Sequence, residues 1–346
     1  MLGSLVAVQD LFPQFEIKVY KMKQKNNYCG IDVSNETLDL YFKNKQGNHQ
    51  HLQVSNSAAG FRKMLKEAGK ETHFVMEATG VYHLNLIFFL QERKAAFSVV
   101  NALQIKRYIQ MHLERNKSDK KDAKRIYEYG ADRMPETYSM PDMSYFECRS
   151  LNNSIHDLTK EITKFSNQIH SLKKCPFDRR MIERSFLKII KKLKEEKQDL
   201  ETVLQEKLTQ WEGETLKLVM SIKGIGSKAA AELIIYTQGF KDMNSYKQLI
   251  SYAGLSPTEY RSGTSVRGRV RICKQGGKQL RHILYMCALN AKKTNAHCRA
   301  LFDRLVEKGK NKKAAIIAVC NKLLKIVFGV VKNRTIYQDN YIQKSA

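Results

Sequence analysis

The sequence has 346 residues, with 60 lysines and arginines against 34 aspartates and glutamates, and so a formal net charge of +26. An excess of this size favours a polyanionic partner, usually nucleic acid, while 42% hydrophobic residues and only five prolines exclude a disordered chain. We find no apolar run of about 18 residues and no basic amphipathic anchor, so we expect no membrane association.

The first half of the chain predicts an α/β domain. Residues 28–33, 38–42 and 49–54 alternate between apolar and polar side chains across short turns, which is typical of an antiparallel meander. Helices and strands alternate after the meander, so we expect a mixed sheet. The further elements are helices at 58–68 and 82–92, strands at 73–77 and 97–100, and a helical segment at 102–129 with a polar interruption near 116–118.

The second half predicts a mainly α-helical structure. Apolar residues recur at heptad spacing over 151–172, Pro176 ends this pattern, and a second helix runs from Ile182 to about Trp211. The pair is expected to form an antiparallel hairpin or an arm that pairs with another subunit. Later come a Gly-Ile-Gly turn followed by a helix, and helices at about 279–292 and 312–331. The expected domains are a leader (1–26), an α/β domain (27–134), a linker (135–145), a helical or coiled-coil hairpin (146–213), a C-terminal domain (214–335) and a tail (336–346).

Cysteine usage and the N-terminal residues bear on localisation. The seven cysteines are scattered and include no CxxC pair, which argues against a disulfide framework and a zinc site. The first residues lack the charged region and the cleavage site of a secretory signal. We therefore expect a cytoplasmic protein.

Four acidic residues stand where a metal site would form. Asp32 and Glu77 each lie at the end of a predicted strand, and Asp119 and Asp122 share one face if their segment is helical. Converging carboxylates repel one another, and a divalent cation such as Mg²⁺ relieves that repulsion. Any one of these acids taken alone is more often a turn former or a solvated partner of a nearby lysine.

A loop between Thr258 and Arg271 combines hydroxyls, glycines and arginines. Between residues 255 and 285 there are seven lysines and arginines and one acid, so the loop suits a nucleic-acid backbone. A hydroxyl flanked by arginines could also attack a phosphodiester. Chemistry alone does not choose among Ser256, Ser262, Thr264 and Ser265, and a basic binding loop with structural hydroxyls explains the composition equally well.

Two blocks of this sequence resemble one known family. GIDVSNETLDLY, MEATGVYH and NKSDKKDA resemble the N-terminal DEDD domain of insertion-sequence transposases of the IS110 family. The run from KGIGSKAAAELI through YAGLSPTEYRSGTSVRGRVR to ILYMCAL resembles the C-terminal transposase domain of that family. The likeness spans about Asn27 to Ala288. Lys223 departs from it, because the family commonly has proline before the Gly-Ile-Gly turn.

The resemblance implies a RuvC-like, RNase-H-type first domain whose acids bind Mg²⁺, with Mn²⁺ as the alternative, and Ser262 as the nucleophile. It also implies a composite site between the subunits of a dimer or tetramer, a phosphoserine link to donor or target DNA, and a structured guide (bridge) RNA that selects both DNAs. A nucleoid-associated prokaryotic protein is then expected. The expected site residues are Asp32, Glu77, Asp119, Asp122 and Ser262 for catalysis, and Lys117, Lys120, Lys121, Arg261, Arg267, Arg269, Arg271, Lys274 and Arg281 for nucleic-acid binding.

Three hypotheses follow. The leading one is an RNA-guided DNA recombinase that inserts and excises its own mobile element through a serine intermediate. The alternative is a metal-dependent, junction-specific nuclease of RuvC-like fold, in which water attacks and the hydroxyl loop only binds. A third is a non-catalytic nucleic-acid-binding protein, which leaves both the acids and the serine without a chemical role.

Overall fold

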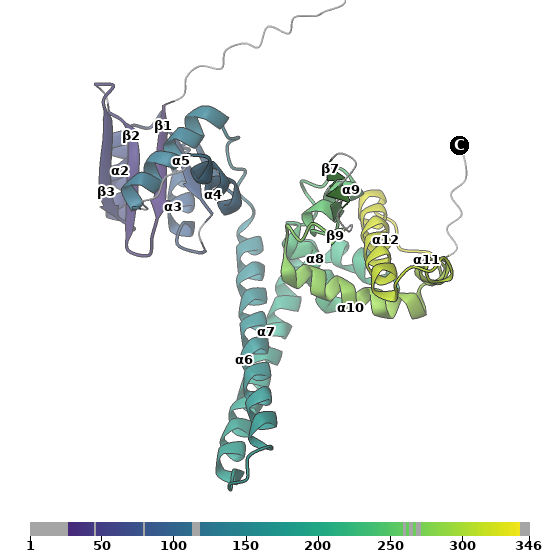
Figure 1. Cartoon of the computed structure of the whole chain (residues 1–346). Coiled ribbons are helices and arrows are strands. Elements are labelled where there is room, and N and C mark those ends of the chain that lie inside the picture. The colour runs from purple at the N-terminus through teal and green to yellow at the C-terminus, as the bar shows by residue number, and fades with distance from the viewer. Residues whose placement is uncertain are drawn as a thin grey trace, which may run out of the picture. The chain divides into compact units, whose positions relative to one another are not determined.

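A computed structural model describes residues 27–44, 46–78, 80–112, 118–258, 261–262, 266–267 and 271–339, with only the backbone described at 261–262 and 266–267. The chain divides into two compact units, Met1–Met140 and Pro141–Ala346 (Figure 1). The predicted leader at 1–26 lies outside the described residues, as do Lys117, Arg269, Thr264 and Ser265.

The first unit contains a five-stranded mixed sheet, as the sequence predicts. Its strand order is β3-β2-β1-β4-β5. The first three strands are antiparallel because tight turns join them, whereas β4 and β5 run parallel to β1 because helical crossovers connect them. The strands are β1 (Tyr28–Val33), β2 (Thr37–Lys43), β3 (His49–Ser55), β4 (His73–Glu77) and β5 (Phe97–Val100).

Helices α2 (Ala58–Ala68), α3 (Leu84–Glu92), α4 (Ala102–Met111) and α5 (Asp119–Arg133) complete this unit. One face of the sheet forms an apolar core with α4 and α5, made of Tyr28, Val75, Val100, Ile105 and Ile126. The side chains that alternate with these along the strands are also buried, for example Cys29, Ile31 and Leu40. Both faces of the central strands β1 and β4 are therefore covered, whereas the edge strand β3 is polar and partly open to solvent along most of its length.

Two long helices open the second unit and pack against each other in antiparallel orientation (Figure 1). The rings of Phe165 and Phe186 lie 5.3 Å apart, and farther along the pair Lys207 Nζ donates to a Glu147 carboxylate oxygen at 2.5 Å. The helices are α6 (Met143–Leu172) and α7 (Arg180–Met220). Helix α6 therefore begins inside the predicted linker, and α7 continues past the predicted domain boundary at 213, with a kink at Glu212.

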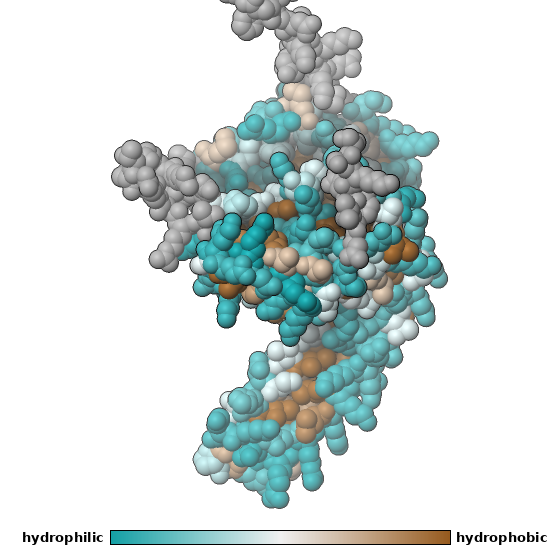
Figure 2. All heavy atoms as spheres, turned by 90° about the vertical axis from the view of Figure 1, so that its right-hand side faces the viewer, coloured by the Kyte–Doolittle hydropathy of each residue, from teal (hydrophilic) through white to brown (hydrophobic). Residues whose placement is uncertain are grey.

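The apolar stripe of the hairpin remains partly open to solvent, because two helices alone cannot enclose it. Figure 2 shows hydrophobic atoms along the arm, bordered by hydrophilic ones. Leu158, Ile162 and Phe165 of α6 are only half-buried. On and beside α7, large apolar side chains are exposed, among them Phe177, Met181 and Leu187.

The rest of the second unit is a helical core formed by α8 (Ser227–Tyr236), α9 (Tyr246–Tyr252), α10 (Lys278–Thr294), α11 (Ala296–Glu307) and α12 (Lys312–Asn333). The sequence predicts α8, α10 and α12 but misses the short α9 and α11. The stripe of apolar residues on α11 is narrow and includes one buried side chain, Cys298.

Helix α12 corrects the expectation that the chain has no apolar run of membrane-spanning length. Among the described residues it is the one helix long and apolar enough to cross a membrane, with a mean hydropathy of 2.0 over 18 residues. Its Ala315, Val319, Leu323 and Val327 are fully buried in the helical core of the second unit. The hydropathy of α12 is that of a helix surrounded by other helices.

The seven cysteines are free thiols. Five of them are buried, namely Cys29, Cys148, Cys287, Cys298 and Cys320, and burial raises the pKa of each. Cys175, in the turn between α6 and α7, and Cys273, just after β9 (Arg271–Ile272), are half-exposed.

Candidate active site

The acidic site is built on a close approach between α5 and β1. A Cβ atom at Gly30 would lie 2.2 Å from the Tyr127 backbone nitrogen and 2.3 Å from the Ala123 carbonyl oxygen. At the other end of this contact, a Cβ atom at Gly130 would lie 3.1 Å from the Tyr28 ring. Residue 130 therefore lies over the start of β1 and residue 123 near its middle, so α5 runs antiparallel to β1. The first turn of α5 consequently reaches the carboxyl end of β1.

This packing brings the predicted acids to one edge of the sheet. Asp32 follows Gly30 by two residues and therefore faces α5. Glu77 follows Val75 by two residues, and Val75 contacts α5 at Gly130, so Glu77 lies on the same face. Asp119 and Asp122 occupy the first turn of α5, where the helix dipole favours negative charge.

The electrostatics of Asp32 show that these acids are neighbours. Its pKa is raised to about 6, first by partial burial and then by the negative charges of Asp122, Asp119, Glu77 and Asp39. A carboxylate among other carboxylates takes up a proton more readily because ionisation adds a repulsive charge. This edge of the sheet therefore gathers several acidic side chains around the half-buried carboxylate of Asp32.

The donor set suits a divalent cation by its chemistry. All four predicted ligands are carboxylates, which Mg²⁺ and Mn²⁺ prefer, and they come from three elements that meet at one edge. Within the described part of the chain, no three acidic, histidine or cysteine side chains lie close enough together to form a ready ligand group. The other acids lie within electrostatic range of Asp32.

A fifth acid beside Asp32 is missing from the sequence prediction. Asp39 of β2 pairs directly with Asp32 of β1 and is 5% exposed. Its two carboxylate oxygens lie 2.7 Å from His51 Nε2 and 3.0 Å from Gln53 Nε2, both from β3. The sequence carries a sign of this site, since LDLYF places an aspartate within a predicted strand, where charge needs a partner. Asp39 thus adds negative charge beside Asp32 while its own oxygens are held by β3.

The hydroxyl loop in the second unit contains short strands that the sequence does not predict. Strand β6 (Pro257–Thr258) pairs with β9 (Arg271–Ile272), and β7 (Arg261–Ser262) pairs with β8 (Val266–Arg267), each pair antiparallel. In the inner pair Ser262 stands opposite Val266. We call residues 257–272 the serine hairpin. Strands of two residues are too short for the period-two pattern that reveals longer ones.

The predicted nucleic-acid contacts differ in their surroundings. Lys120 and Lys121, in the first turn of α5, are exposed, and so are Arg271 and Lys274 at the foot of the serine hairpin. Arg281 is half-buried, and its guanidinium donates to backbone carbonyl oxygens of its own chain. The side chains of Arg261, Ser262 and Arg267 lie outside the described structure, as do Lys117 and Arg269.

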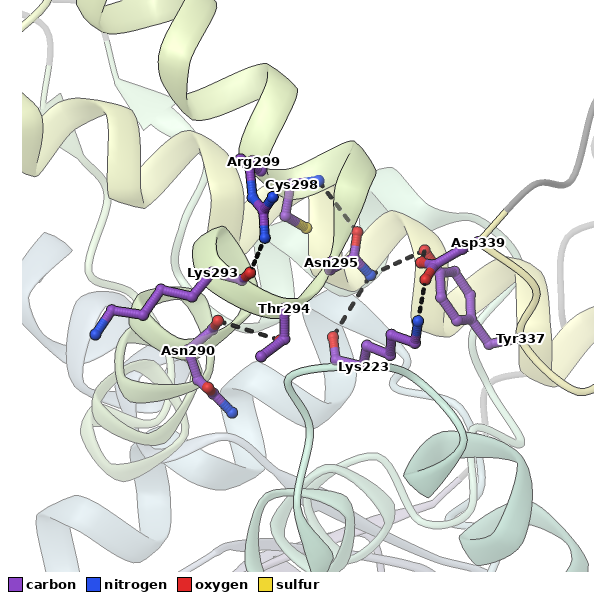
Figure 3. A network of polar contacts seen from close by, with 9 residues as sticks. All are labelled: Lys223, Asn290, Lys293, Thr294, Asn295, Cys298, Arg299, Tyr337 and Asp339. Carbon is purple, nitrogen blue, oxygen red and sulfur yellow. Dashed lines mark hydrogen bonds and ion pairs between the residues drawn. The ribbon is translucent and has the colours of Figure 1, made fainter.

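The Gly-Ile-Gly turn is a packing corner. Gly224 has a φ of +104°, and a Cβ atom there would lie 2.6 Å from that of Ala291 in α10. Lys223, the departure from the family pattern, pairs with Asp339 near the end of the described chain (Figure 3). Buried Asn295 closes the corner, because its side-chain amide nitrogen donates to the Tyr337 hydroxyl at 2.9 Å. This corner holds the end of α10 against α8 and the C-terminal segment.

The fold and the acidic edge define a basic α/β protein of nucleic-acid chemistry, and comparison with known proteins names its family. Residues 29–174 match the DEDD-type IS110 transposase model, and residues 216–303 match the transposase model of the IS116/IS110/IS902 family. The chain belongs to the IS110 family of transposases. The four predicted acids lie within the first matched segment, and the serine hairpin lies within the second.

Two relatives of this chain have names that state a DNA inversion, and a third is named as an uncharacterized protein of an insertion element. The pilin gene-inverting protein of Moraxella bovis is 28% identical over 315 residues, which cover 88% of this chain and 95% of that protein. The pilin gene-inverting protein of Moraxella lacunata is 28% identical over 322 residues, with the same coverage. An insertion element IS110 protein of 43.6 kDa from Streptomyces coelicolor is 26% identical over 121 residues, 35% of this chain and 30% of that protein.

Proposed function

We propose that this transposase is an RNA-guided recombinase that cuts and rejoins DNA through a covalent link to Ser262. The observation that carries the proposal is the convergence of Glu77, Asp119 and Asp122 on Asp32, whose pKa they help to raise to about 6. Such a site suits phosphodiester chemistry with a divalent cation, which would stabilise charge on the phosphate. The strand order of the first unit is compatible with a RuvC-like, RNase-H-type fold.

The proposed chemistry is a transesterification. The Ser262 hydroxyl oxygen forms a bond to phosphorus while the bond from phosphorus to a deoxyribose oxygen breaks; the serine hydroxyl loses its proton to solvent and the released deoxyribose oxygen takes one up. One phosphoester bond replaces another, so a new sugar hydroxyl can attack the phosphoserine, release the serine hydroxyl and rejoin the strand without an external energy source. The inversion named in the Moraxella relatives is a rearrangement of this cut-and-rejoin kind.

The roles of the chain's own residues follow from their positions. Asp32, Glu77, Asp119 and Asp122 would hold Mg²⁺ or Mn²⁺ at the carboxyl edge of the sheet. Arginines and lysines of the serine hairpin would hold backbone phosphate, a contact that carries no sequence information. Sequence choice is therefore assigned to pairing between a structured guide RNA and the donor and target DNA, with the protein acting as a dimer or tetramer.

A covalent adduct tests this proposal. The full chain is purified with RNA from the sequence flanking its gene, given Mg²⁺ and labelled donor and target duplexes, and examined on a denaturing gel. We expect a labelled, protease-sensitive band that disappears in Ser262→Ala and in Asp32→Asn. Ser256→Ala, which removes a hydroxyl at the foot of the same hairpin, is the matched control and should keep the band.

Two results would contradict the proposal. Cleaved DNA without the band, persisting in Ser262→Ala, would identify a water-using metal nuclease in which the hairpin only binds. Binding that survives all of these substitutions with no cleavage in any divalent ion would leave a non-catalytic nucleic-acid-binding protein.

A further inference from the structure

We propose that Arg281 is a positioning residue for the serine hairpin and not a contact for nucleic-acid phosphate. This inference rests on the proposed role of Ser262, and it replaces the role that the sequence predicts for Arg281. It concerns the two segments that flank the hairpin, residues 253–256 before it and residues 273–277 after it.

Arg281 bridges these two flanks directly. Its Nη1 donates to the Gly276 carbonyl oxygen at 2.8 Å and to the Ala253 carbonyl oxygen at 3.3 Å. Arg281 lies in the first turns of α10, a rigid element whose Leu280 and Leu284 are fully buried in the core of the second unit. The guanidinium therefore ties the entry and the exit of the hairpin to the core through one nitrogen atom.

The foot of the hairpin is closed around this bridge by backbone hydrogen bonds. The Cys273 N–H donates to the Ser256 carbonyl oxygen at 2.9 Å, and the Lys274 N–H donates to that of Gly254 at 3.1 Å. One step further out, the Thr258 hydroxyl donates to the Arg271 carbonyl oxygen at 3.0 Å. The foot is therefore a continuous ladder from Gly254 to Arg271, with Arg281 at its inner end.

Two glycines make room for the bridge. A Cβ atom at Gly254 would lie 2.6 Å from Arg281 Nη1, and Gly254 has a φ of +70°. A Cβ atom at Gly276 would lie 2.3 Å from the Tyr252 carbonyl oxygen, with a φ of +154°. Side chains at either position would displace the guanidinium or the chain beside it, so both glycines fit the bridge that the structure shows.

Tyrosines fix the exit of the hairpin at the start of α10. The Gly277 N–H donates to the Tyr236 hydroxyl, and a Cβ atom at Gly277 would lie 2.4 Å from the Tyr236 ring. The rings of Tyr236 and Tyr252 lie 4.9 Å apart. Tyr236 therefore fixes the exit of the hairpin and Arg281 holds its entry, so the described foot at residues 254–258 and 271–277 is anchored on both sides.

A single-turnover assay separates positioning from phosphate binding. With the DNA and RNA of the adduct assay at saturating concentration, we expect Arg281→Ala to slow adduct formation about 10- to 100-fold, because small misplacements of a reacting group cost rates of this order. Affinity for nucleic acid and its dependence on salt should not change, since no phosphate contact is lost. Arg281→Lys should recover part of the rate, because its ammonium keeps the charge and the N–H donors but is not held in place by a rigid planar group.

Arg299→Ala is the matched control. Its guanidinium also donates to a backbone carbonyl, that of Lys293 at the far end of α10 (Figure 3). Residues 281 and 293 are separated by about 18 Å along the helix. Arg299→Ala removes the same charge and the same kind of contact away from the hairpin, and it should leave the rate of adduct formation unchanged.

Hydrogen exchange provides a readout that does not depend on the adduct. In Arg281→Ala the amides of residues 254–256, 258 and 271–277 should exchange at least about 10-fold faster while those of α12 keep their protection. If the wild-type chain forms no adduct, the proposed function is overturned, but hydrogen exchange still tests the role of Arg281.

Two results would overturn the positioning role of Arg281. One is unchanged hydrogen exchange at the foot in Arg281→Ala. The other is weaker nucleic-acid binding with a lower salt dependence at an unchanged single-turnover rate.

Discussion

The acidic edge and the serine hairpin are held in place by different means. The acids stand on a sheet and a helix whose backbones touch at Gly30, so the interior of the first unit fixes their positions. The serine stands on strands of two residues, held at their foot by a ladder of hydrogen bonds and by Arg281. The acidic edge is therefore as stable as the first unit. We expect that changes to the serine hairpin, in contrast, leave the helical core of the second unit folded.

We expect the largest effect from a substitution of Gly30, which would disrupt the packing that positions the acidic edge. In Gly30→Ala the new methyl group would meet the backbone of α5, which cannot rotate away, so we expect a loss of about 3 kcal/mol or more in the free energy of unfolding. Calorimetry should show a lower melting temperature for the first unit, and DNA cleavage should be lost.

Gly329→Ala is the control for this change. Gly329 lies within α12, and a Cβ atom there would meet nothing within 4 Å. Alanine should therefore stabilise that helix by about 0.5–1 kcal/mol. Equal melting temperatures for Gly30→Ala and wild type would contradict the close packing of α5 on β1.

A smaller effect tests the crowding of charge around Asp32. The pKa of Asp32 in the folded protein is about 6, above that of an aspartate in an unfolded chain, about 3.9. The folded state therefore binds more protons between these values, and the free energy of unfolding falls as pH rises through this window. Without divalent ions, Asp32→Asn should melt above wild type at pH 7.5, and the two should approach each other at pH 5.

Solvent screening limits this difference to about 2–4 °C, because Asp32 is only partly buried. Differential scanning calorimetry at the two pH values measures it directly. Added Mg²⁺ should raise the melting temperature of wild type more than that of Asp32→Asn. An equal gap at both pH values would show that burial and the neighbouring acids do not raise the pKa of Asp32.

The smallest expected effect tests whether the foot of the serine hairpin binds backbone phosphate. Arg271 is exposed at the foot of the hairpin, so Arg271→Ala should weaken duplex binding and reduce the slope of log affinity against log salt by about 0.9. Titrations at several salt concentrations give this slope. Lys160→Ala, on the exposed face of α6, is the control and should leave the slope unchanged. An unchanged slope in Arg271→Ala would remove this arginine from the interface.

The sequence predicts the first unit well because its signals are local. Alternation marks β1, β2 and β3, and the structure confirms the mixed sheet with antiparallel pairs first and parallel pairs after. The sequence does not predict α11, whose apolar stripe is narrow, or strands as short as β7 and β8. The apolar length of α12 can be read from the sequence but is overlooked in the prediction, whereas its burial among the other helices is seen only in the structure.

In the candidate site too, the sequence predicts what depends on local pattern and misses what depends on contacts between distant residues. The four acids can be named from their places at strand ends and on one helical turn, but their proximity depends on the contact of α5 with Gly30, which joins residues far apart in the chain. Asp39 is missed because its partners His51 and Gln53 come from a neighbouring strand. The sequence prediction assigns Arg281 to nucleic-acid binding, because composition cannot distinguish an exposed arginine from one that donates hydrogen bonds to backbone carbonyl oxygens of its own chain.

The two half-exposed cysteines have a practical consequence. Burial slows thiol chemistry at the other five, since the thiolate is the reactive form and their pKa values are raised. A maleimide dye should therefore attach first at Cys175, in the turn of the helical arm, and at Cys273, beside the last strand of the hairpin. Because both lie within Pro141–Ala346, the wild-type chain carries a natural pair of fluorophore positions. Energy transfer between them would report the distance between the helical arm and the hairpin, without any engineered residue.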